Sequence, residues 1–261
     1  LARSYPKDRK LRKVLSTLGD LGADQALIAS TYEDCLQADL SESLRIGYMR
    51  DLAQHLLERM HLPDEACGWY EQIIENDSSD RRALEALAAT YRETASYSSE
   101  ERILSQLIDL AKNRTETVRF SIRLGDVRLE HLGKTKDALL AYEDCIPEGL
   151  RDASFRAKIE RLYGQRRDFS GLLDIYNLTL EQDVNDEVKL EMLAKSAQVL
   201  ETQLEDLDGA AEQCRSMLQL EDTHRFALKT LARIERAREN WIELFDVLAT
   251  LADIAEEESE K

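Results

Sequence analysis

The sequence predicts an all-α protein, a solenoid in which about seven antiparallel helix pairs stack on one another. The 261 residues include only 10 Gly and 3 Pro, about 5% of the chain where average usage is roughly 12%. Leu, Ala, Glu, Lys and Arg are abundant, and these residues favour helices joined by short connections. Hydrophobic residues make up 43% of the chain, enough for a sizeable core. A short apolar pattern also recurs with one period along the whole sequence.

The recurring pattern is a large apolar residue followed by a small one. It occurs at Leu52-Ala53, Leu87-Ala88, Leu124-Gly125, Leu193-Ala194 and Leu231-Ala232. Leu15-Ser16 extends the series backwards, and Ile159-Glu160 keeps its register with the small residue replaced. The second members lie 34 to 38 residues apart, with a mean of 36. A fixed period of this length is typical of helical repeat arrays.

A second series runs about 17 residues downstream of the first. Its members are Tyr32, Tyr70, Leu107, Tyr142, Tyr176, Cys214 and Val247. Two series with one period predict two helices in each repeat. The first helix presents a small residue that allows close approach, and the second presents a bulky residue. Because a two-helix unit cannot bury its apolar face alone, neighbouring units must stack.

By this period the chain divides into seven repeats within a single domain, residues 1–261. Their approximate bounds are 7–40, 43–78, 80–112, 114–147, 151–182, 185–220 and 222–255. Residues 1–6 have the character of the end of a preceding second helix, and the chain stops soon after the last second helix. We therefore expect a segment of a longer protein.

Helix starts are marked by residues whose side chains cap a first turn. Asp168 precedes Phe169, Asn185 precedes two acidic residues, and Asn240 precedes Trp241 with Glu243 in the position of a capping box. Three prolines are expected between helices, where a missing N–H costs nothing: Pro6, Pro63 and Pro147.

The clearest repeat resembles the tetratricopeptide repeat family. It runs from Leu124-Gly125 through the turn residue Gly133 to Ala138, Tyr142 and Cys145. These match the family's Leu-Gly pair, turn Gly, second-helix Ala, aromatic residue and following small residue. The resemblance covers residues 7–255, although other repeats depart from the pattern. It implies a right-handed superhelix, with ligands bound along a concave groove formed by the first helices.

Composition excludes several classes of function. Asp and Glu number 52 against 35 Lys and Arg, a net charge of −17, so we expect no binding to nucleic acid, which is a polyanion. No stretch approaches 18 apolar residues without a charge, so we expect no membrane insertion. Cys35, Cys67, Cys145 and Cys214 lack the spacing of a metal site or disulfide framework. We expect buried, free thiols and a cytoplasmic protein.

Catalytic and cofactor motifs are also missing. Gly133-Lys134-Thr135 imitates the end of a phosphate-binding loop, but Arg128 stands where that loop needs a glycine. The four histidines show no zinc-ligand spacing, and no nucleophile motif of the GxSxG kind occurs. The sequence therefore predicts a protein that is not an enzyme and holds no cofactor or metal.

The first helices carry a charge bias. In the resembled family, the groove is faced by the residues 6 and 3 before, and 1, 4 and 5 after, the small residue. Of the 35 such positions here, 11 are basic and 7 acidic, a local charge of +4 in an acidic protein. This excess favours an acidic peptide, or an acidic face of another protein, as the partner.

The strongest part of this predicted surface is near the C-terminus. Phe226, Lys229, Arg233 and Arg236 follow one another at spacings of 3, 4 and 3, which places them on one helix face. An aromatic residue beside three cations is typical of a binding hot spot. The other residues predicted to bind the partner are Arg82, Arg119, Arg161 and Lys195. The Asn residues of the family's clamp for C-terminal peptides do not recur.

Three functions remain open at this point. The first is a non-catalytic scaffold that binds a partner protein in the groove. The second is a regulatory domain of a larger signalling or transcription protein. The third is an RNA-processing scaffold of the half-a-TPR family, which 138–144 would suit as a second helix. The first-helix Trp of that family is missing, because Trp69 and Trp241 both fall in second helices. The oligomeric state is not predicted.

Overall fold

The computed structural model describes residues 6–7 and 9–259. Every regular element in these residues is a helix, which confirms the predicted all-α class. Residues 1–5, most of the segment expected to end a preceding helix, lie outside the described residues. The chain divides into two compact units, Leu1–Cys145 and Ile146–Lys261. That one solenoid runs through both units remains a prediction.

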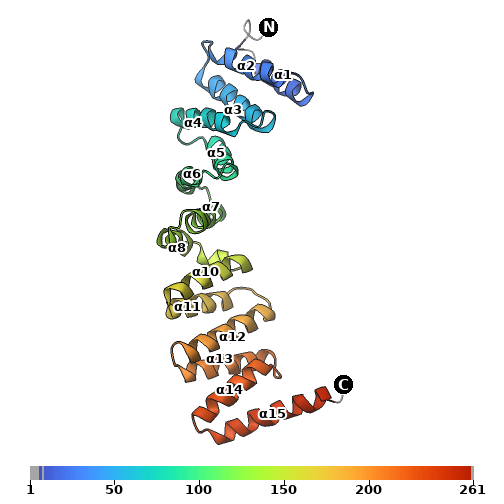
Figure 1. Cartoon of the computed structure of the whole chain (residues 1–261), viewed down its shortest axis with the longest axis vertical. Coiled ribbons are helices and arrows are strands. Elements are labelled where there is room, and N and C mark those ends of the chain that lie inside the picture. Colours follow the sequence, from blue (N-terminus) through green and yellow to red (C-terminus); the bar gives the residue numbers. More distant parts are fainter. Residues whose placement is uncertain (1–5, 8, 260–261) are drawn as a thin grey trace. The chain divides into compact units, whose positions relative to one another are not determined.

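Unit 1 contains four helix pairs, whose antiparallel hairpins follow one another in Figure 1. They are α1 (Arg9–Asp20) with α2 (Gln25–Leu36), α3 (Glu42–Glu58) with α4 (Pro63–Asn76), α5 (Arg81–Glu93) with α6 (Tyr97–Asp109), and α7 (Arg114–Asp126) with α8 (Thr135–Glu143). A π-helical turn, η2 (Val127–His131), continues α7 and was not predicted.

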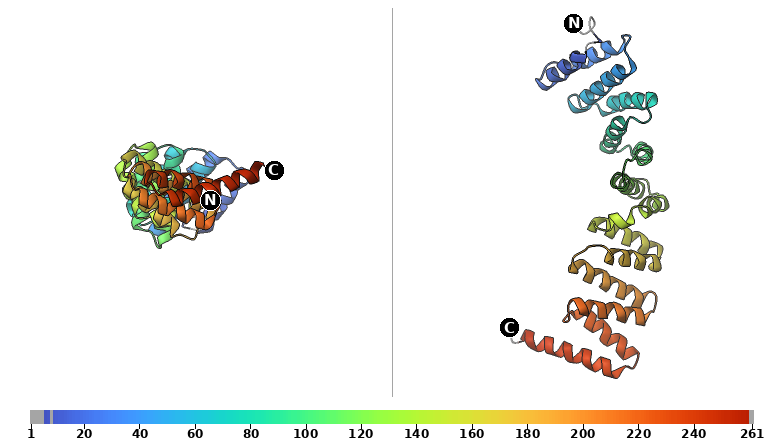
Figure 2. Two further views of the ribbon diagram at one scale, coloured as in Figure 1. Left: turned by 90° about the horizontal axis from the view of Figure 1, so that it is seen from below. Right: turned by 180° about the vertical axis from the view of Figure 1, so that it is seen from behind.

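Unit 2 begins with the short helix α9 (Ile146–Gly149) and continues with three pairs, seen from behind in Figure 2. These are α10 (Ala153–Arg166) with α11 (Phe169–Leu180), α12 (Asp186–Thr202) with α13 (Leu207–Leu220), and α14 (Arg225–Ala237) with α15 (Trp241–Ser259). The pairs of the two units agree with the predicted fold class of about seven antiparallel helix pairs. Helix α9 runs past the predicted repeat limit at residue 147, and α15 runs past the one at residue 255.

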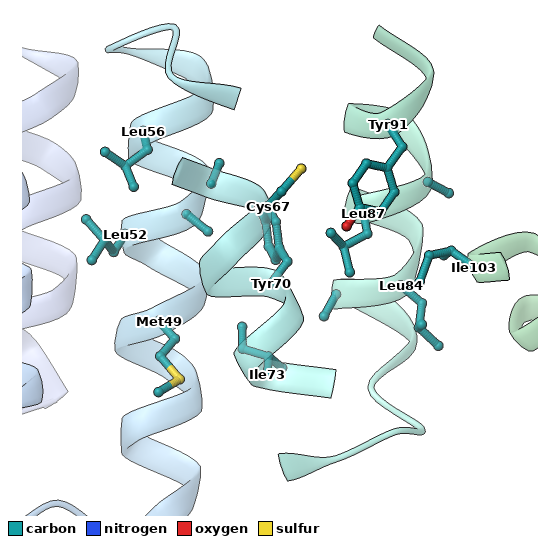
Figure 3. Packing of buried hydrophobic residues seen from close by; sticks show 14 of the residues in the cluster. Met49, Leu52, Leu56, Cys67, Tyr70, Ile73, Leu84, Leu87, Tyr91 and Ile103 are labelled. Atoms are coloured by element: carbon teal, nitrogen blue, oxygen red, sulfur yellow. The ribbon is translucent and has the colours of Figure 1, made fainter. Parts of the chain in front are cut away.

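The cores of the units are built from the predicted small and bulky residues. Ala53 of α3 is fully buried, and Tyr70 of α4 is 4% exposed. Figure 3 shows Leu87 of α5 pointing toward Tyr70 of α4, so that the second helix of one pair packs against the first helix of the next. Burial of such aliphatic side chains, each worth about 1.5–3 kcal/mol, is the main force that stacks the pairs.

Gly125 shows why the first helix needs a small residue. A Cβ atom at this position would occupy the space of the Tyr142 ring, which lies directly against Gly125. The hydroxyl of Tyr142 donates to Asp126 Oδ1 at 2.7 Å, so the ring is held in place at both ends. The interpretation of Leu124-Gly125 as a close-approach site is therefore confirmed.

The turn inside each pair has a common backbone feature. One residue per turn adopts a left-handed conformation, with φ between 54° and 78°. The seven residues are Gly22, His61, Ala95, Gly133, Arg167, Glu205 and Glu239. Of these seven, only Gly133 was predicted as a turn residue, because a positive φ at a residue other than glycine leaves little trace in the sequence.

Two of the predicted helix caps are confirmed. Asp168 accepts from the backbone N–H of Gly171, and Asn185 accepts from that of Val188. The prediction for Pro147 was wrong, because it lies within α9 rather than between helices. It is the second residue of that helix, where no intrahelical partner exists for an N–H. Pro63 is likewise the first residue of α4.

Candidate protein-interaction surface

All eight residues predicted to bind a partner lie on first helices. Unit 1 carries Arg82 on α5 and Arg119 on α7. Unit 2 carries Arg161 on α10, Lys195 on α12, and Phe226, Lys229, Arg233 and Arg236 on α14. Seven of these side chains are exposed and Lys195 is half-buried. These residues were chosen as the groove positions of the resembled family, and that they bind a partner remains a prediction.

The four residues of α14 form one exposed stripe. Between them lie Ala227, Leu228, Thr230, Leu231, Ala232, Ile234 and Glu235, all buried. Phe226 is 39% exposed, so neighbouring residues cover it only in part. The helix therefore separates a core face from a face that carries one aromatic ring and three cations.

Arg233, however, is already engaged within unit 2. Its Nε and Nη2 atoms each donate to a carboxylate oxygen of Glu201, both at 2.6 Å. The side chain of Glu201, on α12, is only 14% exposed. The hydrogen bond to this carboxylate raises the pKa of Arg233. This forked pair joins two successive first helices.

Lys195 is also held by its own unit. Its Nζ lies 2.8 Å from Glu160 Oε2 and 2.6 Å from Glu191 Oε1. Burial lowers the pKa of Lys195, but the hydrogen bonds to Glu160 and Glu191 outweigh burial and raise it. Glu160 is the residue that replaces the expected small one, and its contact with Lys195 gives that departure from the pattern a structural reason.

Unit 1 repeats this arrangement. Ion pairs between successive first helices, or between a first helix and the cap of the next, are Arg12–Asp51, Arg50–Asp80, Arg81–Glu116 and Arg119–Glu85. These pairs were not predicted, because the charged residues of each helix were compared with one another and not with those one repeat away. Opposite charges separated by about one repeat were the available signal.

The ion pairs reduce the surface that is free for a partner. Within the described part of the chain, Arg82, Arg161, Lys229 and Arg236 make no ion pair. Lys229 and Arg236 lie on the same helix face as Phe226. The structure thus brings together, on α14, one exposed aromatic ring and two exposed cations that have no acidic partner among the described residues.

A cavity in unit 1 includes another of the predicted residues. It has a volume of about 410 Å³ and lies among α5, α6 and α7. Its lining residues are Glu85, Ala88, Ala89, Arg92, Glu100, Leu104, Leu107, Arg119, Phe120 and Arg123. Arg119 is 63% exposed, and its guanidinium carbon lies 4.5 Å from the centre of the Phe120 ring. The contribution of second-helix residues to this cavity was not predicted.

The four cysteines are free and buried, as predicted. Burial raises the pKa of Cys67 to about 11 and that of Cys214 to about 12. In the residues described, we find no group of three or more His, Cys, Asp or Glu side chains arranged to hold a metal ion. Among the helices that the structure describes, none combines the length and apolar character that a membrane span requires.

Comparison with known proteins supports the fold. No family model matches the chain, and no curated protein matches it significantly. The structure of Naa15/Naa10 bound to HypK-THB matches 88% of this chain with a TM-score of 0.53 and 15% identity. This chain spans only 35% of the length of that one.

Two further solved structures are similar over a smaller part. YrrB, a TPR protein with an unusual peptide-binding site, is 16% identical over 70% of this chain and 89% of its own, with a TM-score of 0.42. MamA from Desulfovibrio magneticus is 17% identical over 71% of this chain and 99% of its own, with a TM-score of 0.41. The paired helices, the close-approach site and the Naa15/Naa10 match together show a tetratricopeptide-like α-solenoid fold.

Proposed function

We propose that this protein is a non-catalytic scaffold that binds an acidic segment of a partner protein along its first helices. The observation that carries the proposal is the exposed stripe of α14, in which Phe226, Lys229 and Arg236 share one face. An exposed ring supplies apolar area, and the two cations attract carboxylates.

Arg233 supports this surface indirectly. Its fork with Glu201 fixes α14 against α12, and so it holds the stripe on a rigid element. Binding residues on a preformed surface lose less conformational entropy than residues on a mobile loop. The protein as a whole carries a charge of −17, so an acidic partner is attracted only where cations gather.

The state of the thiols supports a function without covalent catalysis. Cysteine reacts as the thiolate, and burial holds the pKa of Cys67 near 11 and that of Cys214 near 12. At neutral pH these side chains are therefore protonated and shielded. They serve as small apolar packing groups between helices.

A charge-reversal experiment tests the proposal. The variant Lys229→Glu/Arg236→Glu changes the two cations of α14 that have no acidic partner and leaves the Arg233–Glu201 pair intact. The control Lys136→Glu/Arg151→Glu makes the same change of charge at two exposed positions, one on α8 and one before α10. Wild type and both variants are used to capture partners from native lysate, and the bound proteins are identified by mass spectrometry.

We expect wild type and control to capture a partner with an acidic segment that the α14 variant loses. The affinity for that segment should also fall steeply between low and high salt, because exposed charges are screened. Equal capture by all three proteins would contradict binding at α14. Capture by none would favour the alternative of a regulatory domain whose ligand acts through other parts of a larger protein.

A further inference from the structure

We propose that the cavity among α5, α6 and α7 receives a tyrosine side chain from an acidic partner segment. This inference rests on the proposed scaffold function and adds the chemistry of the ligand. The cavity belongs to unit 1, whereas the α14 stripe belongs to unit 2. Three features of the cavity, its floor, its rim and one buried carboxylate, support a ligand of this kind.

The floor of the cavity is apolar. Ala88, Leu104, Leu107 and Phe120 line it, and each of these residues is less than 10% exposed. A volume of about 410 Å³ falls within the range of sites that bind small ligands or single large side chains. An aromatic or large aliphatic side chain of a partner would therefore be desolvated on entering.

The rim of the cavity carries exposed cations. Arg92 and Arg119 both line it, and both side chains are exposed. Arg119 lies 3.8 Å from Glu85, at the limit of an ion pair between two exposed side chains, so water competes with that contact. Carboxylates on either side of an inserted side chain would pair with these guanidinium groups, so we expect the segment to be acidic.

The buried carboxylate belongs to Glu100, which is 1% exposed and also lines the cavity. Its Oε1 atom accepts from Arg123 Nε at 2.8 Å and from Arg123 Nη2 at 2.7 Å. Its Oε2 atom has no hydrogen-bond partner among the described residues. A buried acceptor without a donor is unfavourable, so a ligand that displaces enough of the lining to bring a donor to this atom gains affinity.

A tyrosine satisfies the floor and the carboxylate together, since it joins an apolar ring to a hydroxyl donor. The protein already uses this pairing between its own helices. The hydroxyl of Tyr142 donates to Asp126, and that of Tyr91 donates to Glu71. In the proposed complex a partner's tyrosine would make the equivalent hydrogen bond to Glu100.

Labelled hexapeptides test this directly with the full chain. The probes are acidic hexapeptides with Tyr, Phe or Ser at a central position, and binding is followed by fluorescence anisotropy. We expect the Tyr peptide to bind about tenfold more tightly than the Phe peptide, because a hydrogen bond to a charged group is among the stronger ones. The Ser peptide should bind most weakly, because the serine side chain is too small to cover the apolar floor of the cavity.

Cavity filling provides a second test. Ala89 is an exposed residue of α5 that lines the cavity, so Ala89→Leu should obstruct it without disturbing the core. We expect this variant to bind the Tyr peptide at least tenfold more weakly. Ala157→Leu makes the same change at an exposed position of α10, in unit 2, and should bind as wild type does.

Two further variants separate the contributions of rim and carboxylate. Arg92→Ala should weaken the binding of the Tyr peptide and of the Phe peptide by the same factor, because it removes only the attraction for the flanking acidic residues. Glu100→Gln should reduce the preference for Tyr over Phe several-fold, because an amide oxygen is a weaker acceptor than a carboxylate. Circular dichroism of each variant checks that its helices are kept.

A Phe peptide that binds as tightly as the Tyr peptide, or an Ala89→Leu variant with unchanged affinity, would overturn the inference. So would the absence of binding by all three peptides. Failure of the scaffold proposal can be distinguished from failure of this inference. The test of the scaffold proposal reverses the charges of Lys229 and Arg236 on α14 and leaves this cavity unchanged.

Discussion

At the scale of single residues, each turn inside a helix pair contains one residue in the left-handed region of the backbone. Each turn places one residue at positive φ, yet glycine fills that position only at Gly22 and Gly133. A left-handed conformation costs an alanine about 1 kcal/mol more than a glycine. We therefore expect Ala95→Gly, at φ 55°, to stabilise the protein by about 0.5–1 kcal/mol in urea unfolding.

Gly133→Ala is the matched control for this change, at φ 65°. It introduces the same strain that Ala95→Gly removes, so we expect it to destabilise the protein by about 1 kcal/mol. A Cβ atom at residue 133 would meet no neighbouring atom, so the effect comes from the backbone alone. Destabilisation by Ala95→Gly would contradict this account of the turns.

The close approach at Gly125 gives a second prediction at this scale. A methyl group there would overlap the Tyr142 ring, so Gly125→Ala should lose about 1–3 kcal/mol of stability through overpacking. In the preceding repeat, the small residue is Ala88 and the bulky residue is Leu107. An alanine at 125 should therefore be tolerated better beside a leucine, and adding Tyr142→Leu should restore part of the lost stability. The measurement is a double-mutant cycle in urea, in which strictly additive effects would argue against a direct contact.

Buried ionisable groups make stability depend on alkaline pH. Burial raises the pKa of Cys67 to about 11 and those of Tyr48 and Tyr70 to about 12, whereas the unfolded chain ionises these groups near pH 8.5 to 10. Above about pH 9 the unfolded state therefore binds fewer protons than the folded state. Their stabilising contribution, present at lower pH, is lost as the pH rises through these folded-state values.

We expect the free energy of unfolding to fall from pH 9 to pH 11, each such group contributing at most about 1.4 kcal/mol per pH unit. Urea unfolding at several pH values measures this slope. Cys67→Ala removes one of the groups and should give a shallower slope than wild type. An identical slope in that variant would show that Cys67 ionises equally in both states.

At the scale of the helical elements, ion pairs connect one first helix to the next. Glu201→Gln would release Arg233 from α12. It should lower the free energy of unfolding by about 0.5–1 kcal/mol, the usual range for a partly exposed ion pair. The cost should shrink in 1 M NaCl, since salt screens the interaction. Unfolding in urea at low and high salt measures both values.

Asp39→Asn is the matched control for this element. The side chain of Asp39 is 99% exposed and lies 3.5 Å from Lys7 Nζ, so this pair is fully solvated. We expect its loss to leave the midpoint of unfolding unchanged at both salt concentrations. A larger effect at Asp39 than at Glu201 would contradict the view that cross-repeat pairs matter because they are fixed on neighbouring helices.

Most of the helical elements could be predicted from the sequence. The seven pairs follow from the period of the small and bulky residues, because packing of two helices imposes that spacing on any sequence. The π-turn η2 and helix α9 were not predicted, since they depend on local shifts in backbone hydrogen bonding that leave the apolar pattern unchanged.

The candidate site shows a different limit. Position along the first helices predicted correctly that Lys195 and Arg233 would lie on a first-helix face. It did not reveal that Glu160 and Glu201, about one repeat earlier, would hold them. Whether a surface charge is available to a partner depends on neighbours in space. A single sequence yields those neighbours only after the repeats have been aligned on each other.

At the scale of the whole molecule, the remaining prediction concerns the two units. In repeat proteins each repeat is stabilised by its own core and by its nearest neighbours. The described helix pairs pack within Leu1–Cys145 or within Ile146–Lys261, and the boundary falls between α8 and α9. We therefore expect the fragments 1–145 and 146–261 each to fold alone, with helical circular dichroism and a cooperative urea transition.

The comparison of midpoints then tests the single-domain prediction for 1–261. If one solenoid runs through both units, the missing interface should lower the midpoint of at least one fragment below that of the full chain, because nearest-neighbour terms add to stability. If the units are independent domains, each fragment should reproduce one of two transitions of the full chain. A fragment that stays unfolded in water would show that its repeats depend on the other unit for their core.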